Sequence, residues 1–353
     1  MKIFATVLLA AMIMISCSSD NKDSKVAETK TVENIELAGA GATFPYPLYS
    51  KLFDAYYKLN GTKVNYQAIG SGGGIKQIIN GTVDFGGTDA FMNEEDMSKI
   101  PGGIAHIPTC LGAVVITYNL EGNPIIKLSG ELIADIFMKK ITKWNAPQIK
   151  AMNPDLNLPD QSISVVHRSD GSGTTFIFSD YMSKVSAEWK EKVGTGKSLK
   201  WPAGIGGKGN QGVAGLIQQM PGAFGYAELI YATSNDMPAA FIQNKSGNFV
   251  APSVESVSLA ANIEMPDDTR VSLTDTDAEF GYPMSSFTWL ILYKQMKFSD
   301  AKATTLMKMV DWMIHDGRVF AEPLHYAPLP DAAVNKAVRV LSSIRNNGKP
   351  IEY

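Results

Sequence analysis

From residue 35 onward, hydrophobic and polar positions follow two alternating periods along the chain. Short apolar or alternating runs typical of strands are followed by segments whose apolar residues recur at helical spacing. This alternation predicts an α/β fold in which helices cover a sheet. The predicted strands are 63–69, 83–86, 114–119 and 163–167, and the predicted helices are 48–59, 75–80, 129–137, 174–184, 212–219 and 301–313.

Two apolar strands are longer than the others, at 113–118 and 287–293. They lie far apart in the sequence, so we expect them to be paired crossovers between two domains. The chain has 353 residues, 45% of them hydrophobic and 19% charged, which is enough for two cores rather than one. The formal net charge of −3 argues against a nucleic-acid partner, because such proteins present a basic field to the phosphate backbone.

The N-terminal segment has the pattern of an export signal. Lys2 precedes an uncharged apolar run over 3–15, which is too short to span a bilayer but suits a signal-peptide core, and Cys17 follows it. We predict a signal peptide over 1–17 that ends at a lipidated Cys17 and anchors the protein to a membrane at the periplasm or cell surface. An ordinary signal cleaved nearby is the alternative. Residues 18–34 are polar and lack aromatic side chains, which predicts a flexible tether.

Cys110 is the only other cysteine in the chain. If Cys17 is acylated, no internal disulfide can form. Because Cys110 lies in the apolar run 109–116, we expect it to be buried as a small hydrophobic side chain.

The most informative motif is the octapeptide 168–175, which stands between a predicted strand and a predicted helix. Gly171 and Gly173 allow a tight turn, and the hydroxyls of Ser172 and Thr174 join the free amides at the start of the helix. Arg168 adds a planar fork of charged donors, which Asp170 can hold in place. These features predict an oxyanion site. The alternative is a surface loop whose Arg–Asp pair only caps a helix.

Two further stretches repeat the same design of strand, glycine turn and helix. In the first, over 38–47, Thr43 occupies the predicted N-cap position and Pro45 is tolerated in the first turn. In the second, over 70–74, glycines flank Ser71. Three such turns with hydroxyls favour one shared anion site over three unrelated loops.

Other motifs in the sequence do not meet the requirements of the enzyme and nucleotide sites they resemble. The segment 194–198 resembles the end of a nucleotide-binding P-loop, but Glu191 stands where that loop needs a glycine. The Gly-Ser-Gly turns are one residue too tight for a serine-hydrolase elbow. A metal-assisted phosphatase would need clustered ligands, whereas the histidines are scattered, so we expect structural histidines, no metal and no cofactor. These histidines are His106, His167, His315 and His325.

With these motifs in hand, the chain resembles the phosphate-binding protein of bacterial phosphate ABC transporters, the PstS family. The resemblance implies a two-lobed α/β fold of the periplasmic-binding-protein type, type II-like, with phosphate in the cleft between lobes joined by a hinge. Lobe 1 would comprise 35–118 and 288–353, and lobe 2 would comprise 119–287. The segments that carry the resemblance are 39–45, 63–67, 83–86, 143–145, 168–176, 188–190, 206–210 and 221–223.

The resemblance also implies a function and a set of contacts. The protein would be a monomer that captures inorganic phosphate and delivers it to the membrane permease subunits of an ABC transporter. Asp170 would orient Arg168 from behind. This sequence departs from the family pattern at Gly72 and Thr88, where serine is frequent, and neither change removes an expected contact. The expected phosphate contacts are Thr43, Phe44, Ser71, Asp89, Arg168, Ser172, Gly173 and Thr174.

Asp89 has a distinct expected role. Phosphate carries at least one proton at neutral pH and sulfate carries none, so an ionised Asp89 can accept a hydrogen bond from phosphate and only repels sulfate. The alternative is that Asp89 merely caps a helix before 91–95. Two other classes of protein stay open at this point. An extracytoplasmic phosphatase would use the same anion cradle, and an adhesin or scaffold lipoprotein would need no small-molecule affinity.

Overall fold

The computed structural model describes residues 35–353; the predicted signal peptide, the tether and Cys17 lie outside them. The strands are β1 (Glu36–Gly41), β2 (Lys63–Ala68), β3 (Phe85–Thr88), β4 (Ile104–Tyr118), β5 (Lys127–Leu128), β6 (Ser164–Arg168), β7 (Ile205–Gly207), β8 (Ala223–Glu228), β9 (Phe241–Gln243), β10 (Phe249–Val250), β11 (Leu273–Thr274), β12 (Met284–Tyr293), β13 (Gln295–Met296), β14 (Arg345–Asn346) and β15 (Lys349–Pro350). The helices are α1 (Tyr46–Asn60), α2 (Ser71–Ile79), α3 (Glu94–Ser98), α4 (Gly130–Phe137), α5 (Pro147–Met152), α6 (Gly173–Val185), α7 (Ala187–Lys192), α8 (Gly209–Gln219), α9 (Leu229–Thr233), α10 (Val254–Ala260), α11 (Asp300–Ile314) and α12 (Asp331–Ser342), with short 3-10 turns at Asp316–Phe320 and Glu322–Leu324.

The main sheet has the strand order β2-β1-β3-β12-β4-β8-β6-β7, and β11 pairs with β12. At one end β2, β1 and β3 are parallel, and at the other end β8, β6 and β7 are parallel. Between them, β12 and β4 are antiparallel to each other and to their outer neighbours β3 and β8. The predicted α/β class is therefore confirmed.

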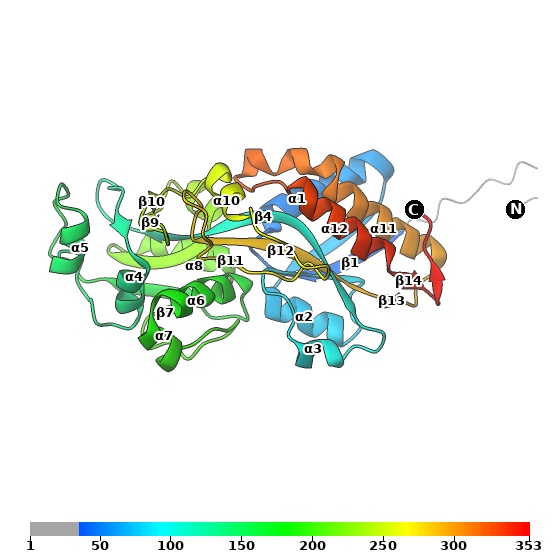
Figure 1. Ribbon diagram of the computed structural model, residues 1–353, viewed down its shortest axis with the longest axis horizontal. Coiled ribbons are helices and arrows are strands. Elements are labelled where there is room, and N and C mark those ends of the chain that lie inside the picture. The colour runs from blue at the N-terminus through cyan, green and yellow to red at the C-terminus, as the bar shows by residue number, and fades with distance from the viewer. Residues whose placement is uncertain (1–34) are drawn as a thin grey trace, which may run out of the picture. The chain divides into compact units, whose positions relative to one another are not determined.

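Strands β4 and β12 run through the middle of Figure 1 and join the two parallel groups. The first part of β4 pairs with β12 and its last five residues, Val114 to Tyr118, pair with β8. All of β4 is buried. Helices α1, α11 and α12 lie above the β1–β3 group in Figure 1, and α2 and α3 lie below it. Each parallel group is thus a strand-and-helix layer, and β4 passes from one to the other.

The first half of β4 is missing from the sequence-based expectation, which begins at residue 113. Pro108 and Thr109 interrupt the apolar pattern there. The register against β12 shifts at this place: Cys110 pairs with Thr288 and Pro108 with Trp289, so Thr109 is the extra residue of a bulge. A proline that lacks an N–H is tolerated at such an irregularity, which is why the strand continues through it.

The N-cap residues of α4 and α1 show how these two helices begin, and one of them differs from the prediction. Ser129, the first residue of the predicted helix 129–137, is the N-cap of α4 and accepts from the Leu132 N–H. The predicted N-cap at Thr43 is wrong, because α1 begins at Tyr46 with Pro45 at the N-cap. The Thr43 hydroxyl accepts hydrogen bonds from Asn210 instead.

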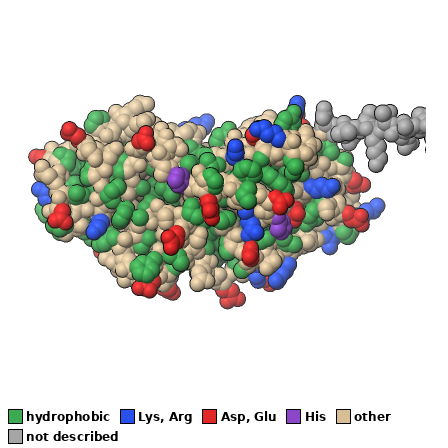
Figure 2. Space-filling model, turned by 90° about the horizontal axis from the view of Figure 1, so that it is seen from above, with side chains coloured by type: hydrophobic (Ala, Val, Ile, Leu, Met, Phe, Trp, Pro, Cys, Tyr) green, Lys and Arg blue, Asp and Glu red, His purple; other side chains and the backbone are tan. Residues whose placement is uncertain are grey.

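Cys110 is fully buried, as predicted. Within residues 35–353, no helix has both the length and the apolar character that a membrane crossing requires. The face shown in Figure 2 carries Lys and Arg side chains interspersed with Asp and Glu, and no continuous basic patch covers that face.

Candidate functional site

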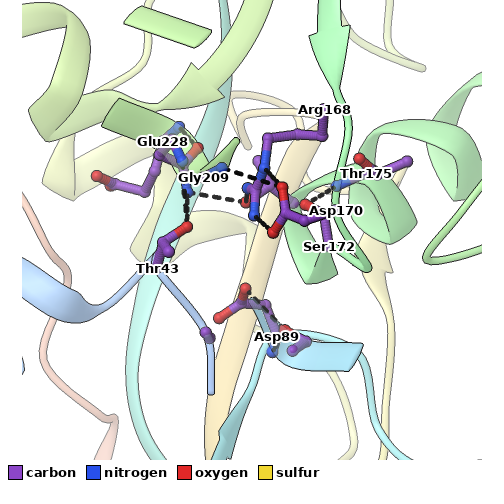
Figure 3. Close-up of polar contacts among 12 residues, drawn as sticks. Thr43, Asp89, Arg168, Asp170, Ser172, Thr175, Gly209 and Glu228 are labelled. Atoms are coloured by element: carbon purple, nitrogen blue, oxygen red, sulfur yellow. Dashed lines mark hydrogen bonds and ion pairs between the residues drawn. The ribbon is translucent and has the colours of Figure 1, made fainter. Parts of the chain in front are cut away.

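The three glycine turns predicted from the sequence lie next to one another. Each turn follows the carboxyl end of a parallel strand, β1, β2 or β6, and leads into α1, α2 or α6. Asp89 follows β3, which pairs with β1, so it reaches the same place. The turns touch directly, because the Gly72 N–H donates to the Gly171 carbonyl at 2.8 Å. Figure 3 shows Thr43, Asp89 and Arg168 facing one region from different elements.

Arg168, the last residue of β6, is buried and held by Asp170. Its Nε donates to Asp170 Oδ1 at 2.8 Å and its Nη2 to Asp170 Oδ2 at 2.6 Å. Asp170 also accepts from the Gly209 N–H at 3.0 Å. Burial pushes the pKa of Asp170 upward, but the hydrogen bonds and charge of Arg168 outweigh burial and hold that pKa below its usual value. The pair therefore keeps both charges fixed around neutral pH.

Asp89 is also buried, but its partners are hydroxyls rather than a cation. Thr288 Oγ1 donates to Asp89 Oδ1 at 2.9 Å, and Ser71 Oγ donates to Asp89 Oδ2 at 3.4 Å. Burial raises the pKa of Asp89 to about 7, against the lowering effects of Thr288, the Arg168 charge and Ser71. The sequence predicts an Asp89 that is ionised at neutral pH, whereas burial in the structure shifts this carboxyl toward the neutral form.

The alternative role of Asp89 as a helix cap is wrong. Helix α3 begins at Glu94, and its N-cap is Asn93, whose side chain accepts from the Asp96 N–H at 2.8 Å. The Asp89 side chain faces Ser71 and Thr288 instead.

The start of α6, which comprises Ser172, Gly173 and Thr174, approaches the Asp89 carboxyl at Gly173. Ser172 is the N-cap and accepts from the Thr175 N–H at 3.0 Å. A side chain at Gly173 has no room, because a Cβ there would lie 2.5 Å from Ser71 Oγ and 2.6 Å from Asp89 Oδ2. The glycine thus allows the amino end of a 13-residue helix to approach both side chains.

Thr43 and Phe44 reach the cluster from the β1–α1 turn. Their carbonyl oxygens are engaged: Tyr231 OH donates to the Thr43 carbonyl and Tyr326 OH to the Phe44 carbonyl, both at 2.6 Å. The Phe44 ring is fully buried against the edge of Tyr326. These contacts fix the backbone of the turn beside the anion site.

Asn210 is the main residue of the cluster that sequence reasoning missed. It lies in the first turn of α8 and is fully buried. Its Nδ2 donates to Thr43 Oγ1 at 3.0 Å and to Thr174 Oγ1 at 3.1 Å. The signal was available, because 206–210 is a fourth glycine turn between a strand and a helix. The same segment is one of those that carry the family resemblance.

Glu228 lies behind Asn210 at the end of β8 and is the second residue that was missed. Its Oε2 accepts from the Ile230 N–H at 2.8 Å, and its Oε1 has no hydrogen-bond partner among residues 35–353. Burial raises the pKa of Glu228 well above its usual value, so the neutral form is favoured. Burial therefore opposes ionisation of this carboxyl.

The site has the chemistry of an anion receptor. Arg168 supplies a fixed cation, the hydroxyls and the start of α6 supply neutral donors, and Asp89 supplies an acceptor. His167, next to Arg168, stacks on Trp201 with ring centroids 4.5 Å apart and does not contact these hydroxyls. Among residues 35–353, no group of three or more His, Cys, Asp or Glu side chains is arranged to hold a metal ion.

Comparisons with known proteins agree on one family. Residues 24–316 match the model of the PBP superfamily domain. A protein of Xylella fastidiosa strain Temecula1, named phosphate-binding protein PstS, is 41% identical over 345 residues, which cover 93% of this chain and 94% of that protein. A protein of Pasteurella multocida with the same name is 44% identical over 311 residues, which cover 87% and 90%.

Solved structures show the same fold at lower identity. A high-affinity periplasmic phosphate-binding protein bound with phosphate, PfluDING, has a TM-score of 0.69 at 20% identity and covers 87% of this chain and 94% of its own. A phosphate ABC transporter substrate-binding protein of Clostridium perfringens has a TM-score of 0.62 at 18% identity and covers 84% and 100%. The predicted two-lobed periplasmic-binding-protein fold is confirmed by this likeness.

Proposed function

Because the chain belongs to the PstS family of phosphate-binding proteins, we propose that it captures inorganic phosphate and delivers it to the permease of an ABC transporter. The observation that carries the proposal is the convergence of donors on one buried place. Arg168, Thr43, Thr174 and the start of α6 surround it, and Asp89 is the acceptor among them. A tetrahedral anion that carries a proton satisfies this set, because its oxygens accept and its hydroxyl donates.

The expected contacts become the proposed phosphate ligands. They are Thr43, Phe44, Ser71, Asp89, Arg168, Ser172, Gly173 and Thr174, with Asp170 behind Arg168. We also propose that 35–118 with 288–353 and 119–287 act as two lobes that close over phosphate. The passage of β4 from β12 to β8 supports a hinge there.

The location and attachment of the protein are part of the same proposal. Delivery to a permease places the protein outside the cytoplasm, as the apolar run at 3–15 suggests. We propose lipidation at Cys17 as its anchor, with the folded part acting as a monomer. Labelling with a fatty-acid analogue tests the anchor. A Cys17→Ser variant takes up no label if Cys17 is the acylated residue.

The proposed activity is binding and not hydrolysis. A phosphatase with a serine nucleophile needs a base that takes the hydroxyl proton, whereas the Ser172 hydroxyl accepts a hydrogen bond from the Thr175 N–H as the N-cap of α6. The Arg168–Asp170 pair holds an anion in place without supplying a base.

Calorimetric titration of phosphate into phosphate-stripped protein tests the function. We expect a dissociation constant of roughly micromolar or tighter, which corresponds to a binding free energy of about 8 kcal/mol in favour of the complex. A parallel assay with p-nitrophenyl phosphate distinguishes a binding protein from a phosphatase, because a phosphatase would release nitrophenol. Absence of binding at millimolar phosphate, with the protein folded, would overturn the proposal.

A further inference from the structure

Asn210 joins parts of the site that come from distant segments of the chain. It stands between Thr43, in the β1–α1 turn, and Thr174, in the first turn of α6. Its backbone N–H and its Nδ2 donate to Thr43 Oγ1 at 3.2 and 3.0 Å, and the same Nδ2 donates to Thr174 Oγ1 at 3.1 Å. All three side chains are at most 2% exposed, so water does not compete for these bonds.

The direction of these hydrogen bonds is determined by the backbone of Glu228. The Glu228 N–H can only donate, and it donates to Asn210 Oδ1 at 3.0 Å. The other end of the Asn210 amide is therefore the NH₂ group, which has two protons and no acceptor. One proton is available for each threonine hydroxyl.

Each threonine hydroxyl then receives two donors. Thr43 Oγ1 accepts from the backbone and side chain of Asn210, and Thr174 Oγ1 accepts from Asn210 and from Arg168 Nη1 at 3.2 Å. A hydroxyl has two acceptor positions and one proton. With both acceptor positions filled, each hydroxyl has only its O–H left to offer, and it must donate.

We propose that Asn210 is a positioning residue that forces the Thr43 and Thr174 hydroxyls to act as donors to the bound anion. The inference rests on the proposed function, since it assumes that phosphate occupies the space these hydroxyls face. With the hydroxyls fixed as donors, they cannot accept a proton from the ligand. The ligand's own proton is then directed to Asp89.

A double-mutant cycle tests this assignment. Phosphate affinity is measured by calorimetry for the parent and for Asn210→Ala, then for the same substitution in Thr43→Val and, separately, Thr174→Val backgrounds. We expect Asn210→Ala to weaken binding by about tenfold or more in the parent. In at least one valine background the weakening is smaller by threefold or more, because the hydroxyl through which Asn210 acts is gone.

The outcomes separate the inference from the function it rests on. If the parent binds phosphate and the effect of Asn210→Ala differs by less than threefold in both backgrounds, the inference is overturned. If the folded, stripped parent does not bind phosphate, the proposed function fails first. The melting temperature of each ligand-free variant reports a merely structural role, which lowers stability without changing the coupling between residues.

A second variant covers the case in which Asn210→Ala does not fold. Asn210→Asp keeps the acceptor for the Glu228 N–H but replaces the NH₂ group by an oxygen, so the hydroxyls turn toward it. Gln211→Glu is the matched control, because it adds the same charge at the next, exposed position. We expect Asn210→Asp to weaken phosphate binding at least threefold more than Gln211→Glu. Equal weakening would refute the positioning role.

Discussion

Asp170 and Asp89 belong to the same buried site, and only Asp170 is paired with a cation. Two hydrogen bonds from Arg168 hold the pKa of Asp170 below its usual value despite burial. Asp89 receives bonds from the hydroxyls of Thr288 and Ser71, and burial raises its pKa to about 7. The difference teaches that one carboxylate serves as a fixed counter-charge, whereas the other responds to protons in the range where phosphate does.

The largest effect is expected from removing the fixed cation. Arg168→Ala takes away the charge expected to face the anion and leaves the partly buried Asp170 without its partner. We expect phosphate affinity to fall about a thousandfold, about 4 kcal/mol, as for other buried charge pairs that lose one member. Arg168→Lys recovers only part of this, because a point charge cannot make the two-pronged contact. Calorimetry measures both variants.

Circular dichroism is the control for that prediction. An Arg168→Ala variant that is folded and binds phosphate as tightly as the parent would show that the fixed pair is not part of the anion site.

The next effect concerns the stability of the ligand-free protein. Because the pKa of Asp89 is raised to about 7 in the folded state, the folded protein binds more protons than the unfolded chain between about pH 4 and pH 7. Stability contributed by neutral Asp89 is thus lost as pH rises through this window. Asp89→Asn lacks this titration. The free energy of unfolding of the variant minus that of the parent therefore rises by up to about 4 kcal/mol from pH 4 to pH 8.

Urea unfolding of phosphate-stripped protein at several pH values measures this difference. Glu228 is present in both proteins, and its pKa is raised mainly by burial and only in smaller part by the charge of Asp89, so most of its titration is common to the two curves. Parallel curves for the parent and Asp89→Asn would mean that Asp89 is not a proton-responsive group.

A smaller effect is expected on selectivity. At pH 8 we expect the ionised Asp89 to accept a hydrogen bond from phosphate and to repel sulfate, whereas an asparagine would offer sulfate a donor. We expect Asp89→Asn to narrow the ratio of phosphate to sulfate affinity by about tenfold or more, about 1.4 kcal/mol. Paired titrations at one ionic strength give the ratio. An unchanged ratio would place the discrimination elsewhere in the site.

Part of the fold and part of the candidate site can be predicted from the sequence. The α/β alternation and the positions of the three glycine turns follow from local patterns, because turn and cap chemistry depend on neighbouring residues. The Arg168–Asp170 pair belongs to this class, since the two residues are only two positions apart. The first half of β4 was missed because Pro108 and the bulge at Thr109 depend on the partner strand.

Local sequence patterns do not predict the raised pKa of Asp89 or the contacts of Asn210. The pKa of Asp89 depends on burial and on a hydrogen bond from Thr288, which lies 199 residues away in the chain. Asn210 contacts Thr43, which lies 167 residues away in the chain. Such contacts exist only after the sheet has brought the four glycine turns together.

Sulfate affinity as a function of pH tests the contrast between the fixed pair and Asp89 most directly. Sulfate has no proton to give, so it binds beside Asp89 only when Asp89 is itself protonated. With a pKa of about 7, we predict that sulfate affinity of the unmodified protein falls about tenfold between pH 6 and pH 8. Asp89→Asn, the control, shows no such fall. Sulfate affinity that stays constant within about twofold in the unmodified protein over this range would contradict the account.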